Sequence, residues 1–258
     1  MTGDASGSRR DQIAAYVTQR GEVRIDELAA TFGVSRMTIH RHVEDLAHQG
    51  VLRKLHGAVS AQPSGVYESL FTFRQTRAPA AKQALAQAAM AEIEPGQAVL
   101  LDDSTTAGAL GAFLPQVTPV TVITNSLGLI QMLAGVDGID LIALGGDYHP
   151  TYNAFIGPLM QDALAGLRVN IAICSASAIA GGAALIQDAQ VTRAKQAMLA
   201  AAARRVLLVD SSKFGAIALH KMADLNAFDA VYADDALAPE TVSRLRDTGV
   251  ALKLVPLT

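Results

Sequence analysis

The chain has 258 residues, of which half are hydrophobic and 17% are charged, and its formal net charge is −3 at pH 7. This composition excludes a disordered chain, and a single cysteine excludes a disulfide-stabilised secreted scaffold. No run of about eighteen apolar residues predicts a membrane span, and the first ten residues lack the apolar segment of a signal peptide, so we expect a cytoplasmic protein of one or two domains.

The first sixty residues predict three short helices followed by a β-ribbon. We expect the helices at about residues 9–20, 25–32 and 35–49, and the ribbon at residues 51–60. Ser8 and Ser35 are the predicted N-caps, and Gly21 and Gly50 end the first and third helices. Gly33 supplies the turn between the second and third helices. This order is that of a winged helix-turn-helix, which we place in a domain of residues 1–60.

The third helix predicts a DNA-binding surface. Ile39, Val43 and Leu46 form its buried stripe, which leaves the opposite face for DNA. Side chains on that face, on its flanks and on the ribbon can contact phosphates or base edges. The candidate DNA-binding residues are Ser35, Arg36, Met37, Thr38, His40, Arg41, Arg53, Lys54 and His56. Charge alone does not indicate DNA, because residues 1–62 hold eight basic and seven acidic residues, and a solvated amphipathic helical domain is the simpler alternative.

The remainder of the chain predicts a linker and an α/β domain. Residues 61–78 form the linker, which begins at Pro63 and is too apolar, through Tyr67, Leu70 and Phe73, to be free of contacts. From Pro79 to residue 258 short apolar runs alternate with helical segments, which predicts a mostly parallel sheet. The predicted strands are 98–101, 120–123, 140–144, 170–173, 205–209, 230–232 and 251–255, and the predicted helices are 79–93, 106–114, 126–134, 192–204 and 239–247.

Small polar residues follow several of these strands. Because ligands of open parallel sheets bind at the carboxyl ends of the strands, we expect an effector site there. Hydroxyls, an amide and lysines suit a polyhydroxylated anion, and two predicted helix N-termini favour phosphate. The candidate effector-binding residues are Asp102, Ser104, Thr105, Thr106, Thr124, Asn125, Ser126, Gly145, Gly146, Lys195 and Lys213. Taken singly, each has a simpler interpretation as a cap, a turn or, for Lys195, a solvated helix residue.

Both halves resemble a known family. Val34-Ser35, Thr38–His42 and Lys54–Gly57 resemble the DNA-binding domain of DeoR-family bacterial regulators, although His40, His42 and Ala58 replace the family's arginine, aspartate and second glycine. The stretches LDDSTT, VITNS, LGGDY, AKQAM and DSSKFG, with Phe155-Ile156-Gly157, resemble its sensor domain. The resemblance implies a ribose-phosphate-isomerase/CoA-transferase-like fold that senses a sugar phosphate, usually as an inducer that releases a repressor from DNA.

We therefore expect a repressor of a carbohydrate-utilisation operon, modulated by a phosphorylated sugar. Operator half-sites pair with symmetric oligomers, so a homodimer or homotetramer is expected. We expect no catalytic residues, cofactor or metal, since no His/Cys/Asp/Glu cluster has ligand spacing.

Two alternatives remain open. One is a sugar-phosphate isomerase with an accessory helical domain. The resembled isomerases use acidic residues in the loop that corresponds to residues 175–182, and that loop has none here, whereas Asp102, Asp103 and Asp188 are candidates for a base. The other is a DNA-binding protein whose α/β domain serves only oligomerisation.

Overall fold

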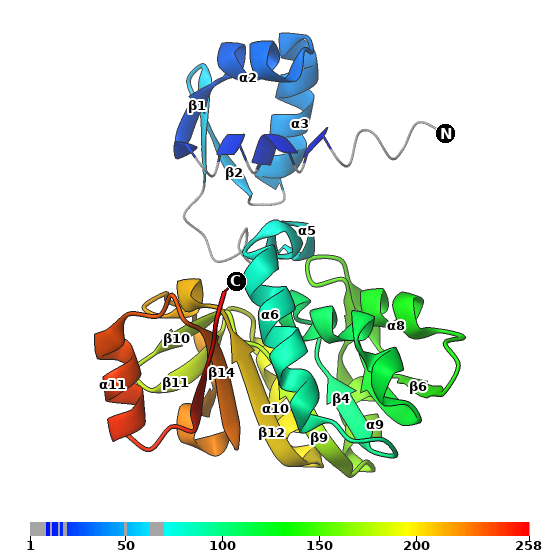
Figure 1. The fold of residues 1–258 in the computed structure, drawn as a ribbon. Coiled ribbons are helices and arrows are strands. Elements are labelled where there is room, and N and C mark those ends of the chain that lie inside the picture. The colour runs from blue at the N-terminus through cyan, green and yellow to red at the C-terminus, as the bar shows by residue number, and fades with distance from the viewer. Residues whose placement is uncertain are drawn as a thin grey trace. The chain divides into compact units, whose positions relative to one another are not determined.

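The computed structural model describes residues 9–10, 12–14, 16–17, 20–48, 51–61 and 70–257. The chain divides into two compact units, residues 1–76 and 77–258. Each unit has its own helices and strands (Figure 1) and its own hydrophobic clusters. The predicted caps Ser8 and Gly50, and the linker residues Pro63 and Tyr67, lie outside the described residues.

The first unit packs helices against a small antiparallel sheet. The described residues from 9 to 20 are helical. Helix α2 spans Ile25–Phe32, α3 spans Arg36–His48, and the strands β1 (Glu22–Arg24), β2 (Leu52–Leu55) and β3 (Ala58–Ala61) lie in the order β1-β3-β2. The three predicted helices and the ribbon are therefore confirmed. Strand β1 was not predicted, because three residues carry little pattern and its pairing with β3 is long-range.

A short helix lies within the predicted linker. Helix α5 spans Phe71–Thr76, and Leu70 and Phe73 pack against the hydrophobic core of the first unit. The expectation that these two side chains make contacts is thus confirmed. The apolar side chains extend the core of the small unit beyond the ribbon.

The second unit is built on a sheet of seven parallel strands. Their order is β15-β14-β12-β9-β4-β5-β6. The strands are β4 (Ala98–Leu101), β5 (Val120–Thr124), β6 (Ile139–Ala143), β9 (Val169–Cys174), β12 (Ala202–Val209), β14 (Ala230–Asp234) and β15 (Leu252–Val255). Each of the predicted apolar runs forms one of these strands, so the predicted parallel α/β fold is confirmed.

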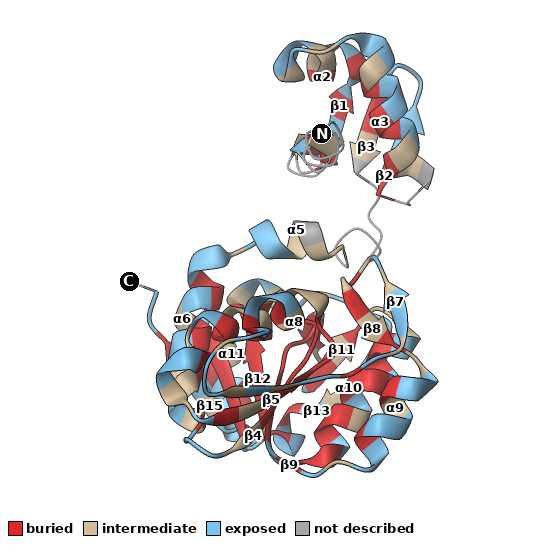
Figure 2. Cartoon of the chain, turned by 90° about the vertical axis from the view of Figure 1, so that its right-hand side faces the viewer, coloured by how far each residue is buried: buried red, intermediate tan, exposed pale blue. Residues whose placement is uncertain are grey.

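Helices cover both faces of this sheet (Figure 2). Successive strand residues alternate between the two hydrophobic clusters, as Leu100 and Leu101 do. Helices α6 (Pro79–Ala89), α7 (Thr105–Gly108) and α8 (Leu127–Leu133) contribute to one cluster, and α9 (Pro158–Ala165), α10 (Ala189–Ala201) and α11 (Pro239–Asp247) contribute to the other. Burial on both faces explains why the strands are continuously apolar.

Several elements of this unit differ from the sequence prediction. A hairpin of β7 (Asp147–His149) and β8 (Ala154–Ile156) and a small sheet of β10 (Ala178–Ala180), β11 (Ala183–Ile186) and β13 (His220–Asp224) were not predicted. The helix predicted at 106–114 is wrong in extent. Helix α7 ends at Gly108, and two 3-10 turns, Ala109–Ala112 and Leu114–Val117, follow it. Gly108 and Gly111 lower the helix propensity of this segment.

Candidate DNA-binding surface and effector site

Local geometry positions the N-terminus of α3. Gly33 ends α2 with a φ of 62°, a left-handed conformation that glycine adopts readily. The Ser35 hydroxyl accepts a hydrogen bond from the backbone N–H of Thr38 at 3.2 Å, so the predicted cap is confirmed. Ile39, Val43 and Leu46 are buried, which fixes the opposite side of α3 toward solvent.

The predicted DNA-contacting side chains are accessible. Met37 is 81% exposed, an unusual state for a large apolar side chain. On α3 and its cap, Ser35, Arg36, His40 and Arg41 are exposed and Thr38 is partly exposed, while Arg53, Lys54 and His56 are exposed on the ribbon. Their arrangement is compatible with a helix in the major groove and a wing beside it. Their contact with DNA stays a prediction.

Two of these cations already have carboxylate partners. Arg36 Nε lies 2.8 Å from Asp26 Oδ1, and Lys54 Nζ lies 2.9 Å from Glu44 Oε1. All four side chains are well exposed, so each pair adds little stability and is readily exchanged for a phosphate. The Lys54–Glu44 pair also connects the ribbon to α3.

His42, one of the departures from the family pattern, lies inside the first unit. Its side chain is 2% exposed, and its Nδ1 atom has no hydrogen-bond partner within the described part of the chain. Burial, together with the positive charges of Arg41 and Arg10, lowers the pKa of His42. The residue is therefore a neutral core side chain rather than a DNA contact.

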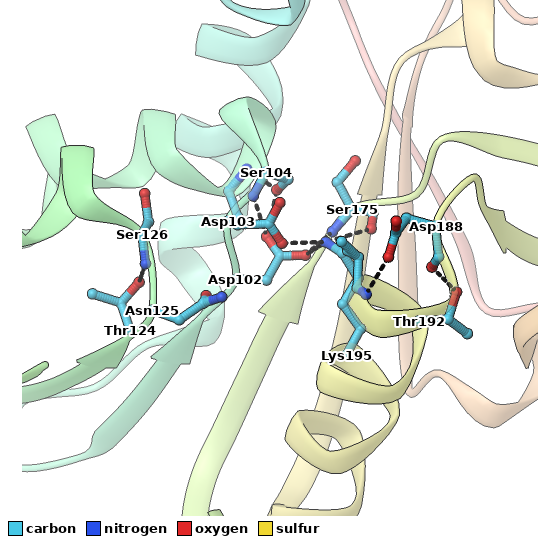
Figure 3. A network of polar contacts seen from close by, with 12 residues as sticks. Asp102, Asp103, Ser104, Thr124, Asn125, Ser126, Ser175, Asp188, Thr192 and Lys195 are labelled. Atoms are coloured by element: carbon cyan, nitrogen blue, oxygen red, sulfur yellow. Dashed lines mark hydrogen bonds and ion pairs between the residues drawn. The ribbon is translucent and has the colours of Figure 1, made fainter. Parts of the chain in front are cut away.

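The predicted effector residues gather at the carboxyl ends of adjacent strands. Asp102 and Ser104 follow β4, while Thr124 is the last residue of β5 and Asn125 follows it. Lys195 reaches the same region from α10 (Figure 3). Gly145 and Gly146 follow β6, which is the next strand in the sheet. Lys213 follows β12. Among the described residues, no hydrogen bond joins the Lys213 side chain to another candidate effector residue.

A buried network of ion pairs and hydrogen bonds lies at the carboxyl ends of these strands. Asp102 accepts hydrogen bonds from Ser104 N at 3.0 Å, Ser104 Oγ at 2.5 Å, Ser175 N at 2.9 Å and the Lys195 ammonium. Lys195 Nζ also lies 3.3 Å from Asp103 Oδ1 and 3.3 Å from the Ser175 carbonyl oxygen. Burial opposes the positive charge of Lys195, but the charges of Asp102 and Asp103 outweigh it and raise the lysine pKa.

This network corrects one interpretation of the sequence. Lys195 is not a solvated helix residue, because its side chain is 3% exposed. Its charge is compensated within the protein, so direct neutralisation of a phosphate would require the network to rearrange. The backbone of Ser175 also takes part in the network, and its role could not be predicted because backbone groups carry no residue-specific pattern.

Burial separates the predicted effector residues into two layers. The inner layer, at most 6% exposed, comprises Asp102, Ser104, Thr106, Thr124, Asn125, Ser126 and Lys195. The outer layer, which solvent reaches, comprises Thr105, Gly145, Gly146 and Lys213. A ligand approaching from solvent meets the outer layer first.

The helix N-termini at this edge are weaker anion sites than the sequence suggests. Ser104 and Ser126 cap their helices, since their hydroxyls accept from Ala107 N at 3.0 Å and Leu129 N at 3.4 Å. Helix α7 has 4 residues and α8 has 7, so few peptide dipoles add up at either N-terminus. Hydroxyl and amide chemistry is the more substantial feature of this edge.

The three carboxylates that could act as a base all have partners within the protein, Asp103 through its contact with Lys195 at 3.3 Å. Asp102 accepts from the donors described above, and Asp188 caps α10 by accepting from Gln190 N at 2.7 Å and Val191 N at 3.0 Å. The loop 175–182 carries neither acid nor histidine. This geometry disfavours proton transfer between sugar carbons.

A separate cavity of about 520 Å³ lies beside α11. It is lined by Ile179, Ala180, Gly181, Gly182, Phe214, Gly215, Thr241, Arg244, Leu245 and Thr248. None of the predicted effector residues borders it, and its polar side chains are two threonines and one exposed arginine. The polar convergence at the carboxyl edge is the stronger candidate site.

Neither a metal-binding cluster nor a membrane-spanning helix occurs in the described parts of residues 9–61 and 70–257. No group of three or more His, Cys, Asp or Glu side chains there could hold a metal ion. No helix in the same residues is long and apolar enough to cross a membrane.

Each of the two units matches the model of a known domain family. The model of the DeoR-like helix-turn-helix domain matches residues 9–64, and that of the DeoR C-terminal sensor domain matches residues 77–235. The L-fucose operon activator of Haemophilus influenzae is 31% identical, over 89% of this chain and 92% of the relative. The glycerol-3-phosphate regulon repressor of Escherichia coli is 28% identical, over 95% and 98% of the two chains.

Solved structures resemble this chain more distantly. D-ribose-5-phosphate isomerase in complex with phospho-erythronic acid aligns with a TM-score of 0.39 and 14% identity, covering 52% of this chain and 53% of that one. The eIF2B delta subunit from Chaetomium thermophilum aligns with a TM-score of 0.44 and 14% identity, covering 65% and 60%.

Proposed function

The chain belongs to the DeoR family of transcription regulators, and from this premise we propose that it represses a carbohydrate-utilisation operon and is released from DNA by a phosphorylated sugar. The relatives described above are named as regulators of an L-fucose operon and a glycerol-3-phosphate regulon. Their names support a regulator of carbohydrate genes rather than an enzyme.

The DNA-binding half of the proposal rests on one observation: the outward face of α3 is exposed and begins at a capped N-terminus. Arg36, Arg41 and the exposed Met37 lie on or beside this face, and the wing cations lie on the neighbouring ribbon. Arginine reads guanine edges or binds phosphate, and an exposed apolar side chain can contact a thymine methyl group. His40 replaces the family's arginine, so the operator sequence is expected to differ from those of relatives.

The effector half of the proposal uses the carboxyl edge of the sheet. Lys213 and the Gly145-Gly146 backbone are accessible to an anionic group, and the inner hydroxyl and amide layer suits sugar hydroxyls. Such a ligand changes DNA affinity only by binding the DNA-competent and DNA-free states differently. Residues 61–78 connect the two units and, with an oligomer interface, are the proposed route of coupling.

Assembly and location follow from the same role. We expect a homodimer or homotetramer, because a symmetric oligomer matches paired operator half-sites. A DNA-binding regulator acts where the genome is, which agrees with the cytoplasmic location expected from the sequence.

Fluorescence anisotropy tests the proposal directly. The full chain is titrated onto DNA from upstream of its own and neighbouring genes, at two salt concentrations, with non-specific competitor and with a panel of sugar phosphates. Tight binding that survives competitor and is relieved by one compound supports the proposal. Binding abolished by competitor contradicts it, and aldose–ketose interconversion by the same preparation would establish the isomerase alternative.

A further inference from the structure

Asn125 makes an unusual set of contacts at the end of β5. Its backbone carbonyl accepts from Phe155 N at 2.9 Å, and its side-chain Nδ2 donates to the Phe155 carbonyl oxygen at 3.0 Å. The second bond fixes the orientation of the amide, because a carbonyl oxygen accepts only from the NH₂ end. The acceptor Oδ1 of Asn125 is therefore turned away from Phe155.

That oxygen is buried and has no hydrogen-bond partner in the part of the chain that the structure describes. Asn125 is 1% exposed, and no donor among the described residues reaches its Oδ1 atom. Buried side-chain acceptors are nearly always hydrogen-bonded, since an unsatisfied one loses its hydration without compensation. The β7–β8 hairpin, whose Phe155 is hydrogen-bonded to Asn125, contains another buried polar atom without a partner among the described residues, Nδ1 of His149. The unsatisfied Oδ1 of Asn125, buried at the strand ends, indicates a partner from outside the chain.

The chemistry of that partner follows from the surrounding charges. Asp102 and Asp103 carry two negative charges, and Lys195 supplies one positive charge, so this buried network is net negative (Figure 3). A phosphate dianion would be repelled by it and has no proton to give to Oδ1. A hydroxyl group is neutral and donates its proton to an amide oxygen without cost in charge.

We propose that a hydroxyl group of the effector donates a hydrogen bond to Oδ1 of Asn125, which makes Asn125 the residue that selects a hydroxylated ligand at this position. The inference rests on the proposed function, because it assigns the sugar end of the same ligand to the inner layer. The phosphate then remains in the outer layer at the Gly145-Gly146 backbone, which follows β6, the strand beside β5.

Glycines stand at both ends of the hairpin that packs beside Asn125. Gly146 and Gly157 bound the hairpin with φ values of 148° and 124°, which other residues rarely adopt. A Cβ atom on Gly146 would lie 2.7 Å from the Ile156 carbonyl oxygen, so the two hairpin ends are in close backbone contact. A larger residue at Gly146 would therefore displace the hairpin that carries Phe155, the hydrogen-bond partner of Asn125.

The test compares ligands that differ by one hydroxyl. Thermal shift and calorimetry first identify which compound, from triose, pentose and hexose phosphates, stabilises the full wild-type chain. Its singly deoxygenated analogues, its unphosphorylated form and inorganic phosphate are then titrated into the wild type and Asn125→Ala. The matched control is Asn226→Ala, which removes an amide-to-carbonyl bond of the same kind (Nδ2 to the Thr248 oxygen, 3.1 Å) in the segment between β13 and β14.

We expect one deoxy analogue to bind the wild type and Asn226→Ala at least about tenfold more weakly than its parent. Asn125→Ala should bind the two compounds equally.

If Asn125→Ala keeps the discrimination, the inference is overturned while the proposed function stands. If no sugar phosphate stabilises the wild type, the effector proposal and the inference both fail. A further outcome is that the unphosphorylated sugar binds as tightly as its phosphate, with an affinity that depends on Asn125. That result supports the inference and refutes only the claim that the effector is phosphorylated. A variant that does not fold is replaced by Asn125→Ser.

Discussion

The ammonium group of Lys195 in α10 donates a hydrogen bond to the carboxylate of Asp102 at the end of β4, 93 positions earlier in the sequence. Both side chains are at most 3% exposed. The pair joins the helical layer on one face of the sheet to the edge where the effector residues gather. A buried pair of this kind gives little net stability over an apolar core, but removal of one partner leaves the other charge buried and uncompensated.

Replacement of the buried cation should therefore be costly. We expect Lys195→Met to lower the free energy of unfolding by about 3–5 kcal/mol, because Asp102 and Asp103 lose their counter-charge. Urea denaturation of the full chain measures this. The control is Lys221→Met, which breaks an exposed pair with Asp224 and should cost at most about 1 kcal/mol. Equal losses in the two variants would mean that Lys195 is not held as an ion pair.

Glu92 should make stability depend on acid pH. Burial alone would raise its pKa, but hydrogen bonds from Lys253, Tyr232 and Arg204 lower it from 4.5 to about 2. Since the folded-state pKa is depressed, the stabilisation is complete above pH 4.5 and is lost as the pH falls toward 2.

At neutral pH, Glu92→Gln should lower the free energy of unfolding by roughly 2 kcal/mol, a figure reduced because Arg204 and Lys253 are half exposed. The difference from the wild type should shrink between pH 4.5 and pH 2 in urea titrations. The exposed Glu94→Gln variant should show no comparable loss at neutral pH. A constant difference across this range would show that Glu92 acts through packing alone.

His42 should make the first unit sensitive to mild acid. Its pKa is lowered by burial and by Arg41, Arg10 and Arg9, with Asp45 acting in the opposite direction. The unfolded chain takes up a proton near pH 6.5 while the folded chain does not, so stability falls as the pH decreases through that value.

Hydrogen exchange of the α3 amides, corrected for intrinsic rates, should show increasing local opening from pH 7.5 to pH 5.5. In His42→Leu this increase should be much reduced, because the buried imidazole that resists protonation is absent. His40→Leu on the exposed side of α3 should keep the wild-type response. Identical pH responses in His42→Leu and the wild type would refute the assignment.

Arg41 should contribute to DNA binding without contributing to stability. Its side chain is exposed on α3. Arg41→Ala should weaken operator binding about tenfold, and, if the contact is to phosphate, reduce the salt slope by about 0.9. Anisotropy titrations measure affinity, and the melting temperature should be nearly unchanged. Arg246→Ala on α11 is the control and should bind DNA normally. A large loss of stability in Arg41→Ala would contradict its exposed placement.

Local patterns were sufficient for much of the fold. Ser35 as a cap, Gly33 as a turn and Pro79 as the first residue of a helix were all predicted from the sequence, as were the seven apolar strands. These features depend on residues a few positions apart, through capping, backbone conformation and burial on both faces of the sheet. The same regularity located the carboxyl edge, because it sets where each strand ends.

Only the tertiary structure decided what the individual side chains do at that edge. The sequence was compatible with Lys195 as a solvated residue, but the fold buries it against Asp102. Helical periodicity could not predict this partner, because Asp102 lies in a distant part of the sequence. Likewise, the free oxygen of Asn125 follows from its bond to Phe155, thirty positions away in a hairpin with no clear sequence pattern. Burial and long-range hydrogen bonding depend on which segments meet in space, and a one-dimensional pattern contains little of that information.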